Sequence, residues 1–240
     1  MRQPGQDPEL PPALHLTPRQ ITVRAGTFRA VAPLLAELVD PRHTALVTQE
    51  CQRGVIGDRA ALPELAEEAR RSGMIERAAA LATAARAADV PVIHCVAERR
   101  ADGRGSNLNA RVFLAMRKQS TLLPGSPEVE VIPEIGTEPV DIVLTRLHGL
   151  GPMGGTDLDA VLRNLGVTTV VGVGVSVNVG MLDLAFDAVN AGYQMVMPRD
   201  AVAGVPADYA TAVLENTVSL VATLPAAEDV IEVWKGTATP

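Results

Sequence analysis

The chain has 240 residues, a net charge of −7, and 47% apolar residues of which very few are aromatic. This length suffices for one large α/β domain, and a core without aromatic side chains must be filled by Val, Leu, Ala and Ile, as in a buried parallel sheet. The negative charge excludes a general electrostatic attraction to nucleic acid or to anionic membranes.

The first 43 residues are expected to form an N-terminal extension to a single domain over residues 44–240. Five prolines within residues 1–18 indicate a loosely ordered arm, and no apolar signal-peptide core is found there. A short strand over 20–26 and a helix over 27–40, interrupted by Pro33, are expected next. The two cysteines are too few for a disulfide framework, and no uncharged run is long enough for a membrane span, so we expect a cytoplasmic protein.

Apolar strands and helices alternate through the rest of the chain. Strands are predicted within residues 43–51, 90–98, 139–148, 167–175 and 193–204, and helices within 74–90, 156–166, 180–192 and 207–224. Thr156 is a predicted N-cap, and Gly166 and Gly192 are predicted helix stops. This alternation is typical of βαβ units around a parallel sheet, whose ligands bind beyond the carboxyl ends of the strands.

Two glycine-containing turns follow predicted strands. Residues 149–154, GLGPMG, fit the dinucleotide pattern G-x-G-x-x-G, so an oxidoreductase is one hypothesis. Pro152 and the lack of an acidic residue at the end of the next strand favour a mobile loop or helix-entry turn instead. The turn near Ser176 fits neither this pattern nor the G-x-S-x-G elbow, because Val177 and Asn178 stand where glycine is required.

Ionisable residues gather at the predicted strand ends. Glu50 ends the first apolar strand, where a carboxyl group is either ion-paired for structure or desolvated and functional. Arg146 and His148 end the third strand, and the loop after the second carries four arginines, namely Arg99, Arg100, Arg104 and Arg111. If these loops meet, they form a positive mouth for a small carboxylated substrate; the alternative is that most are solvated surface charges.

The histidines and cysteines suggest no further site. The four histidines are scattered without the spacing of metal ligands, so no metal is expected. Cys51 and Cys95 lack a histidine at an informative spacing and are expected to be buried as small apolar residues.

Two stretches and the spacing between them resemble a known family. LVDPRHTALVTQECQRGVIG, at residues 38–57, and the run from HGLGPMGGTDLDAVLRNLG to DAVAG, at residues 148–204, are similar to the isochorismatase-like hydrolases, also called the cysteine hydrolase family. The resemblance implies a three-layer α/β/α Rossmann-like sandwich with a central, mostly parallel sheet. It also implies a homo-oligomer, a dimer or tetramer, that needs no cofactor.

The resemblance also suggests the reaction. Amide-cleaving members use an Asp, a Lys and a Cys, whose positions here are Glu50, either Arg146 or Leu147, and Gly180, while Gln52 matches a family glutamine. The zinc ligands of the nicotinamidase branch are absent. Glycine cannot attack a carbonyl, so the closest model for the reaction is that of the isochorismatases. These members also have glycine at the position of Gly180 and cleave a vinyl ether by acid chemistry.

The leading hypothesis is a hydrolase of a small anionic metabolite in which Glu50 acts as acid or base without a covalent intermediate. Its expected catalytic residues are Glu50, Arg146 and Gly180, and its expected substrate-binding residues are Gln52, Ser176, Arg111 and His148. The matching cis peptide of the family is Val175–Ser176, and the N–H groups of Ser176 and Gly180 could hold a substrate oxygen.

The second hypothesis is an inactive relative that binds a ligand or partner in the same pocket. A Glu50 side chain that faces away from any cavity, or that is locked in a buried ion pair, would end the case for a working enzyme. If the pocket instead keeps amidase geometry, Gly180→Cys is expected to acquire a reactive thiol.

Overall fold

The computed structural model describes residues 34–119 and 122–237. The predicted arm over 1–18, the strand over 20–26 and the first part of the helix over 27–40 lie outside these ranges. The boundary between residues 43 and 44 therefore stays a prediction.

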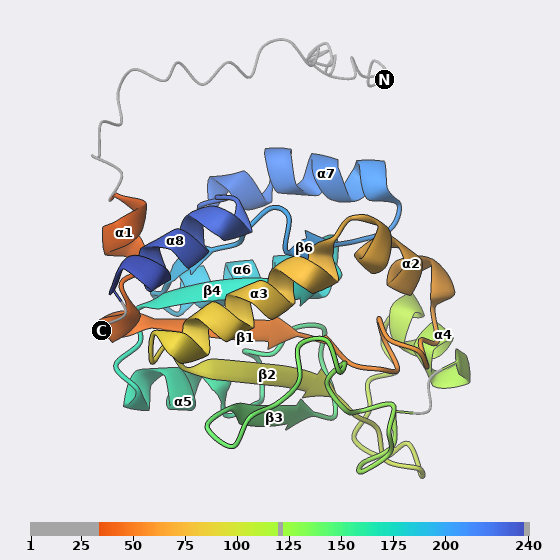
Figure 1. Ribbon diagram of the computed structural model, residues 1–240. Coiled ribbons are helices and arrows are strands. Elements are labelled where there is room, and N and C mark those ends of the chain that lie inside the picture. The colour runs from red at the N-terminus through yellow and green to blue at the C-terminus, as the bar shows by residue number, and fades with distance from the viewer. Residues whose placement is uncertain (1–33, 120–121, 238–240) are drawn as a thin grey trace, which may run out of the picture. The chain divides into compact units, whose positions relative to one another are not determined.

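A six-stranded sheet forms the centre of the domain, with the strand order β3-β2-β1-β4-β5 and with β6 also paired to β4 (Figure 1). Every pairing between these strands is parallel, which confirms the predicted fold class. The strands are β1 (Thr44–Gln49), β2 (Val92–Ala97), β3 (Ile142–Arg146), β4 (Thr169–Val175), β5 (Gln194–Val196) and β6 (Val202–Ala203).

Helices cover both faces of the sheet. Alternate residues of each strand point to opposite faces, so Leu46 joins the core beneath α3 and α8, whereas Val47 joins the core beneath α5 and α6. The helices are α1 (Leu35–Leu38), α2 (Pro63–Arg71), α3 (Met74–Ala87), α4 (Arg111–Gln119), α5 (Leu158–Asn164), α6 (Gly180–Asn190), α7 (Ala207–Asn216) and α8 (Ala227–Thr237). None of the described helices has the length and hydropathy needed to cross a lipid bilayer.

Two glycines end the predicted helices as expected, whereas the predicted N-cap, Thr156, lies one residue before the observed one. The N-cap of α5 is Asp157, and the hydroxyl of Thr156 accepts a hydrogen bond from the N–H of Leu158 (3.1 Å). Gly166 and Gly192 follow α5 and α6 with φ of 70° and 95°, a backbone conformation that favours glycine.

The C-terminal part differs from the prediction in two ways. The single strand expected over 193–204 is two strands, β5 and β6, because Pro198 lies between them and cannot donate to a ladder. The long helix expected over 207–224 ends at Asn216, where Thr217 and Val218 bring weak helix formers, and a 3₁₀ turn over Val218–Leu220 follows.

Three helices were absent from the sequence interpretation. They are α2, α4 and α8. The proline at the start of α2, Pro63, is a common first helical residue, and α8 is fixed by Trp234, whose indole N–H donates to the carbonyl of Val39 (2.8 Å). The carboxyl ends of the strands point toward α2 and α4, so these two helices stand beside the region where a ligand is expected (Figure 1).

Candidate active site

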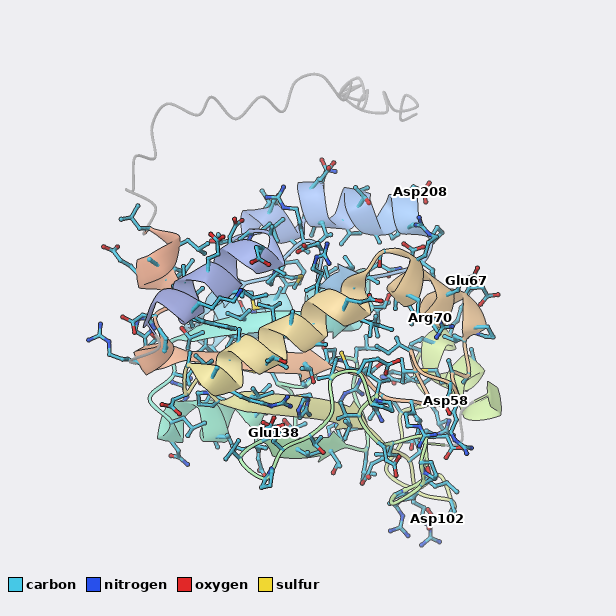
Figure 2. The ribbon with its side chains drawn as sticks, in the orientation of Figure 1. Asp58, Glu67, Arg70, Asp102, Glu138 and Asp208 are labelled. Carbon is cyan, nitrogen blue, oxygen red and sulfur yellow. The ribbon has the colours of Figure 1, made fainter. Side chains whose placement is uncertain are left out.

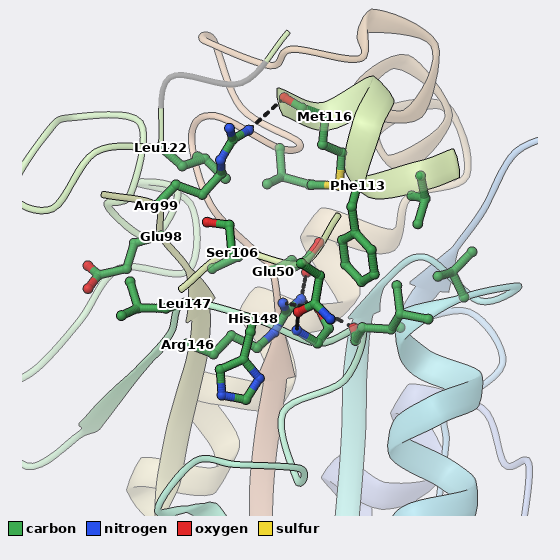
Figure 3. Close-up of a pocket in the computed structure, with 18 of the residues that line it drawn as sticks. Glu50, Glu98, Arg99, Ser106, Phe113, Met116, Leu122, Arg146, Leu147 and His148 are labelled. Carbon is green, nitrogen blue, oxygen red and sulfur yellow. Dashed lines mark hydrogen bonds and ion pairs between the residues drawn. The ribbon is translucent and has the colours of Figure 1, made fainter. Parts of the chain in front are cut away.

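A pocket of about 210 Å³ lies at the carboxyl ends of the strands (Figure 3). Its lining includes Glu50 after β1, Arg146 at the end of β3, and Ser176 and Gly180 from the turn between β4 and α6. His148, from the glycine-containing loop after β3, completes the group of predicted site residues that the fold brings together.

Glu50 and Arg146 form an ion pair in this pocket. Arg146 Nη2 donates to Glu50 Oε1, and the two side chains are 8% and 15% exposed, for Arg146 and Glu50 respectively. Glu50 has a φ of 53°, which is unusual for a residue with a side chain and recurs at functional sites. Its own N–H donates to the carbonyl of Cys95 (2.9 Å). A guanidinium in contact favours the ionised form of the carboxyl group.

The Arg146 guanidinium is held by the loop after β3 as well as by Glu50. Nη1 donates to the carbonyl of Gly149 (2.8 Å), and Nη2 also donates to that of Leu150 (3.2 Å). Burial lowers the pKa of Arg146 to about 10, although the charge of Asp183 acts in the opposite direction. Arg146 is therefore still a cation at neutral pH.

Several polar atoms around this pair lack a protein partner. Arg146 Nε and Gln49 Oε1 are buried without a hydrogen bond from the described residues. Glu50 Oε2 accepts no hydrogen bond from the described part of the chain, whereas Oε1 faces both Arg146 Nη2 and Gln49 Nε2 (3.4 Å). Native structures rarely leave buried polar atoms unsatisfied, so such atoms indicate a missing water or ligand.

The turn at Gly180 has the predicted backbone but little free space. The Val175–Ser176 peptide bond is cis, as the resemblance implied. A Cβ added at Gly180 would lie 2.8 Å from Gln49 Nε2 and 3.0 Å from the carbonyl oxygen of Leu150. A side chain at this position would therefore displace its neighbours.

Within residues 149–154, Gly151 is required by close packing. A Cβ at Gly151 would lie 2.5 Å from Asp183 Oδ2, and Gly155, just beyond the motif, packs against the ring of His148. Burial and the neighbouring charge of Asp187 raise the pKa of Asp183. A carboxyl group against this loop opposes a bound pyrophosphate, so the helix-entry turn is the better interpretation.

Two expected binding residues lie elsewhere. Gln52 is fully buried, and its amide bonds the backbone of Ala97 on both sides, accepting from N (2.7 Å) and donating to O (2.9 Å). Gln52 thus anchors the end of β1 to the end of β2. Arg111 is exposed and is not part of the pocket lining.

The loop arginines also do not form the expected positively charged entrance to the pocket. Arg100 pairs with Asp102 on an exposed loop (Figure 2), and Arg104 is exposed as well. Of the four loop arginines only Arg99 lines the pocket, where its guanidinium donates to the carbonyl of Met116 (2.9 Å). The lining charges of Glu50, Glu98, Arg99 and Arg146 balance.

The sequence interpretation missed the apolar wall of the pocket. Val112, Phe113 and Met116 of α4 line it, together with Leu62, Leu65 and Leu122. Residues 112 and 116 are four apart, the spacing of one helix face, but the polar composition of residues 99–113 predicts a loop there.

A second polar cluster lies inside the α3 face of the sheet. His94 Nδ1 is 2.9 Å from Thr48 Oγ1, and His94 Nε2 is 3.2 Å from Asp141 Oδ2. The carboxylate of Asp141 also accepts from Arg86 Nη2 (2.7 Å). Although this order of groups resembles a catalytic triad, Thr48 and His94 are buried and neither lines the pocket.

Both cysteines lie in the core. Cys51 and Cys95 are free and buried, as predicted, and burial raises the pKa of each thiol to about 12. Among the residues that the structure describes, no three His, Cys, Asp or Glu side chains are grouped to hold a metal ion.

Known proteins share this fold and sequence pattern. A model of the isochorismatase domain matches residues 44–229. YwoC of Bacillus subtilis (strain 168), an uncharacterized isochorismatase family protein, is 39% identical over 72 residues, which are 30% of this chain and 38% of YwoC. YecD of Escherichia coli O157:H7, described in the same words, is 27% identical over 80% of this chain and 97% of its own length.

Solved structures agree. A cysteine hydrolase from Pseudomonas syringae pv. phaseolicola 1448A has a TM-score of 0.71 at 23% identity, and the match covers 83% of this chain and 96% of that one. The fold and the matched domain define an α/β protein with the fold of the isochorismatase-family hydrolases. The chain belongs to the isochorismatase family.

Proposed function

We propose that the chain is a hydrolase of a small molecule that works through a carboxylate and water, without a covalent intermediate. The observation that carries this proposal is that Glu50, although paired with Arg146 through Oε1, lines a pocket at the strand ends and keeps Oε2 without a hydrogen bond from the described residues. Gly180 has no side chain, so no acyl-enzyme can form at the position where the amide-cleaving relatives have cysteine.

Glu50 is the group that we propose moves the proton. Arg146 holds Oε1, which leaves Oε2 to accept a proton from an attacking water. The proton then passes to the leaving group. The N–H groups of Ser176 and Gly180 stabilise the oxygen on which charge develops. Gly180 is the first residue of α6, and the first N–H groups of a helix have no helical acceptor, whereas Ser176 lies in the turn before this helix.

Vinyl ether hydrolysis of the isochorismatase type is the closest reaction model, since it too needs no nucleophilic side chain. In that reaction a carboxylic acid first gives its proton to the vinyl carbon. The contact with Arg146 favours the carboxylate over the acid, so water activation is the better first step for this site.

The substrate that we propose is small and carboxylated. Because Glu50 neutralises Arg146, the recognition of an anion depends on Arg99, which has no ion pair with the described residues, and on His148. We further propose a cytoplasmic homo-oligomer, a dimer or tetramer, that uses no cofactor or metal and carries residues 1–43 as an extension.

The experiment is a turnover screen of small esters, amides and enol ethers that carry a carboxylate. Turnover should survive thiol alkylation and should fall about 10²–10⁴-fold in Glu50→Gln, the usual effect of losing a general base. Glu67→Gln is the control, since Glu67 is an exposed carboxylate on α2 (Figure 2). Equal turnover by the Glu50 variant and the wild type would refute the proposal.

A non-catalytic ligand-binding function is the second candidate, and the ion pair that partly buries Glu50 favours it. It predicts that a compound binds tightly, remains unconverted, and binds equally well to Glu50→Gln. Measured conversion of any bound compound by the wild type would exclude it.

A further inference from the structure

We infer that the pocket selects a compact amphipathic acid, with one apolar ring or branched chain between its carboxylate and the bond to be cleaved. This deepens the proposed function, because it concerns the same pocket. It goes further by naming the substrate body and the residues that select it.

The first argument is the wall formed by α4. Phe113 and Met116 lie on the side of the pocket away from Arg146 (Figure 3). Leu65 of α2 and Leu122 complete the apolar lining. A polyhydroxylated metabolite would lose its water against this surface without gaining hydrogen bonds, whereas an apolar body would gain from the burial.

The second argument is size. The cavity of about 210 Å³ is somewhat larger than the apolar cavity of about 150 Å³ that accommodates benzene in another protein. One ring with a short substituent at each end therefore fits, and a fused polycyclic compound does not.

The third argument is that polar groups lie at two separate places in the pocket. Arg99 and Ser106 lie together at one end, and Ser106 Oγ is buried with no hydrogen-bond partner among the described residues (Figure 3). Glu50 and Arg146 lie further into the pocket. A carboxylate at Arg99 and Ser106 would place the apolar body along α4 and the opposite end of the ligand toward Glu50.

Binding is measured by calorimetry with three probes that need not be substrates: phenylacetate, phenylacetamide and lactate. We expect phenylacetate to bind at least about tenfold more tightly than lactate, which has the charge without the ring, and than phenylacetamide, which has the ring without the charge. Phe113→Ala should weaken phenylacetate about tenfold, and Arg99→Gln should remove its advantage over phenylacetamide.

Leu114→Ala is the matched control, because Leu114 is on the same helix, 48% exposed and not part of the lining. If Phe113→Ala loses helical structure, Phe113→Leu replaces it, with an expected weakening of about threefold. Any one of three results would overturn the inference. Lactate binds as tightly as phenylacetate, phenylacetate does not bind, or substitutions at positions 113 and 114 have equal effects on phenylacetate binding.

The same titrations with Glu50→Gln separate this inference from the proposed function. Intact phenylacetate binding with no turnover of any compound by the wild type would refute hydrolysis and leave the ligand class standing. Turnover restricted to hydrophilic acids would support hydrolysis and refute the ligand class.

Discussion

Two carboxylate–guanidinium pairs in this chain consist of the same groups in different surroundings. Asp141 accepts from Arg86 Nη2 (2.7 Å), from the N–H of Glu138 (2.7 Å) and from His94, and its side chain is 1% exposed. Glu50 pairs with Arg146 through one oxygen in the wall of a cavity.

The two pairs differ in whether their polar atoms all have hydrogen-bond partners. Both oxygens of Asp141 accept hydrogen bonds, from Arg86, His94 and the backbone. We call this cluster closed, because neither carboxylate oxygen is left without a donor. Around Glu50, one carboxylate oxygen and the buried Arg146 Nε have no partner in the described chain. A fully satisfied buried network rigidifies a fold, whereas an incompletely satisfied one beside a cavity is where a ligand gains most by binding.

The largest expected effect is on stability, from Asp141→Asn. The change leaves Arg86, which is 12% exposed, without a carboxylate at hydrogen-bonding distance, and breaking such a buried pair costs about 3–5 kcal/mol. Urea unfolding measures the loss. Glu138→Gln is the control, because this second acid is 3.7 Å from Arg86 and 56% exposed (Figure 2), and it should cost less than about 0.5 kcal/mol. Similar losses in both variants would show that the Asp141 cluster is not a closed network.

The next largest expected effect is a loss of turnover in Arg146→Lys. Lysine keeps the charge but cannot contact Glu50, Gly149 and Leu150 at once in the planar arrangement of a guanidinium. We expect kcat to fall about 10- to 100-fold with a stability loss of about 1 kcal/mol. Arg100→Lys, on the exposed pair with Asp102, should leave both quantities unchanged. Full kcat in Arg146→Lys would mean that only the charge matters.

The sequence predicted the sheet well because its signals are local. Apolar runs identified β1 to β4, and Gly166 and Gly192 marked helix ends by their backbone freedom. Because parallel strands end at one edge, Glu50, Arg146 and Ser176 could be placed together without knowledge of their contacts.

The remaining features depend on distant contacts. Gln52 was expected to bind substrate because it matches a glutamine of the family, and the sequence alone does not show that its amide is buried against Ala97. The role of Gly151 depends on Asp183, more than thirty residues away, and Phe113 becomes pocket wall only because α4 folds over the strand ends.

The third prediction concerns Gly180→Cys and differs from the sequence expectation of a reactive thiol. A Cβ at this position would lie 3.0 Å from the carbonyl oxygen of Leu150, in the loop that also holds Arg146. We expect a stability loss of about 1–3 kcal/mol, as in overpacked cores, and thiol labelling no faster than that of the unfolded chain. Gly180→Ala should show most of the same loss, because the Cβ is the clashing atom. Fast labelling with no loss of stability would show that the Leu150 carbonyl yields easily and that the site still accepts a nucleophile.

The smallest effect is a pH dependence that distinguishes the closed cluster from the pocket. Burial lowers the pKa of His94, although Asp141 acts in the opposite direction, so the unfolded chain takes up this proton at a higher pH than the fold does. Stability contributed by neutral His94 is therefore complete above about pH 6.5, the ordinary pKa of histidine, and is lost as the pH falls below it.

The Asp141 carboxylate contributes in a more acidic range. Burial raises the pKa of Asp141, but the hydrogen bonds from Arg86 and the Glu138 N–H outweigh burial and lower this pKa. The stability contributed by ionised Asp141 is therefore lost only below the ordinary range of aspartate. Urea unfolding from pH 8 to pH 4 should thus show a decline that begins near pH 6.5 and is reduced in His94→Gln. An unchanged decline in that variant would assign the acid sensitivity to groups outside the cluster.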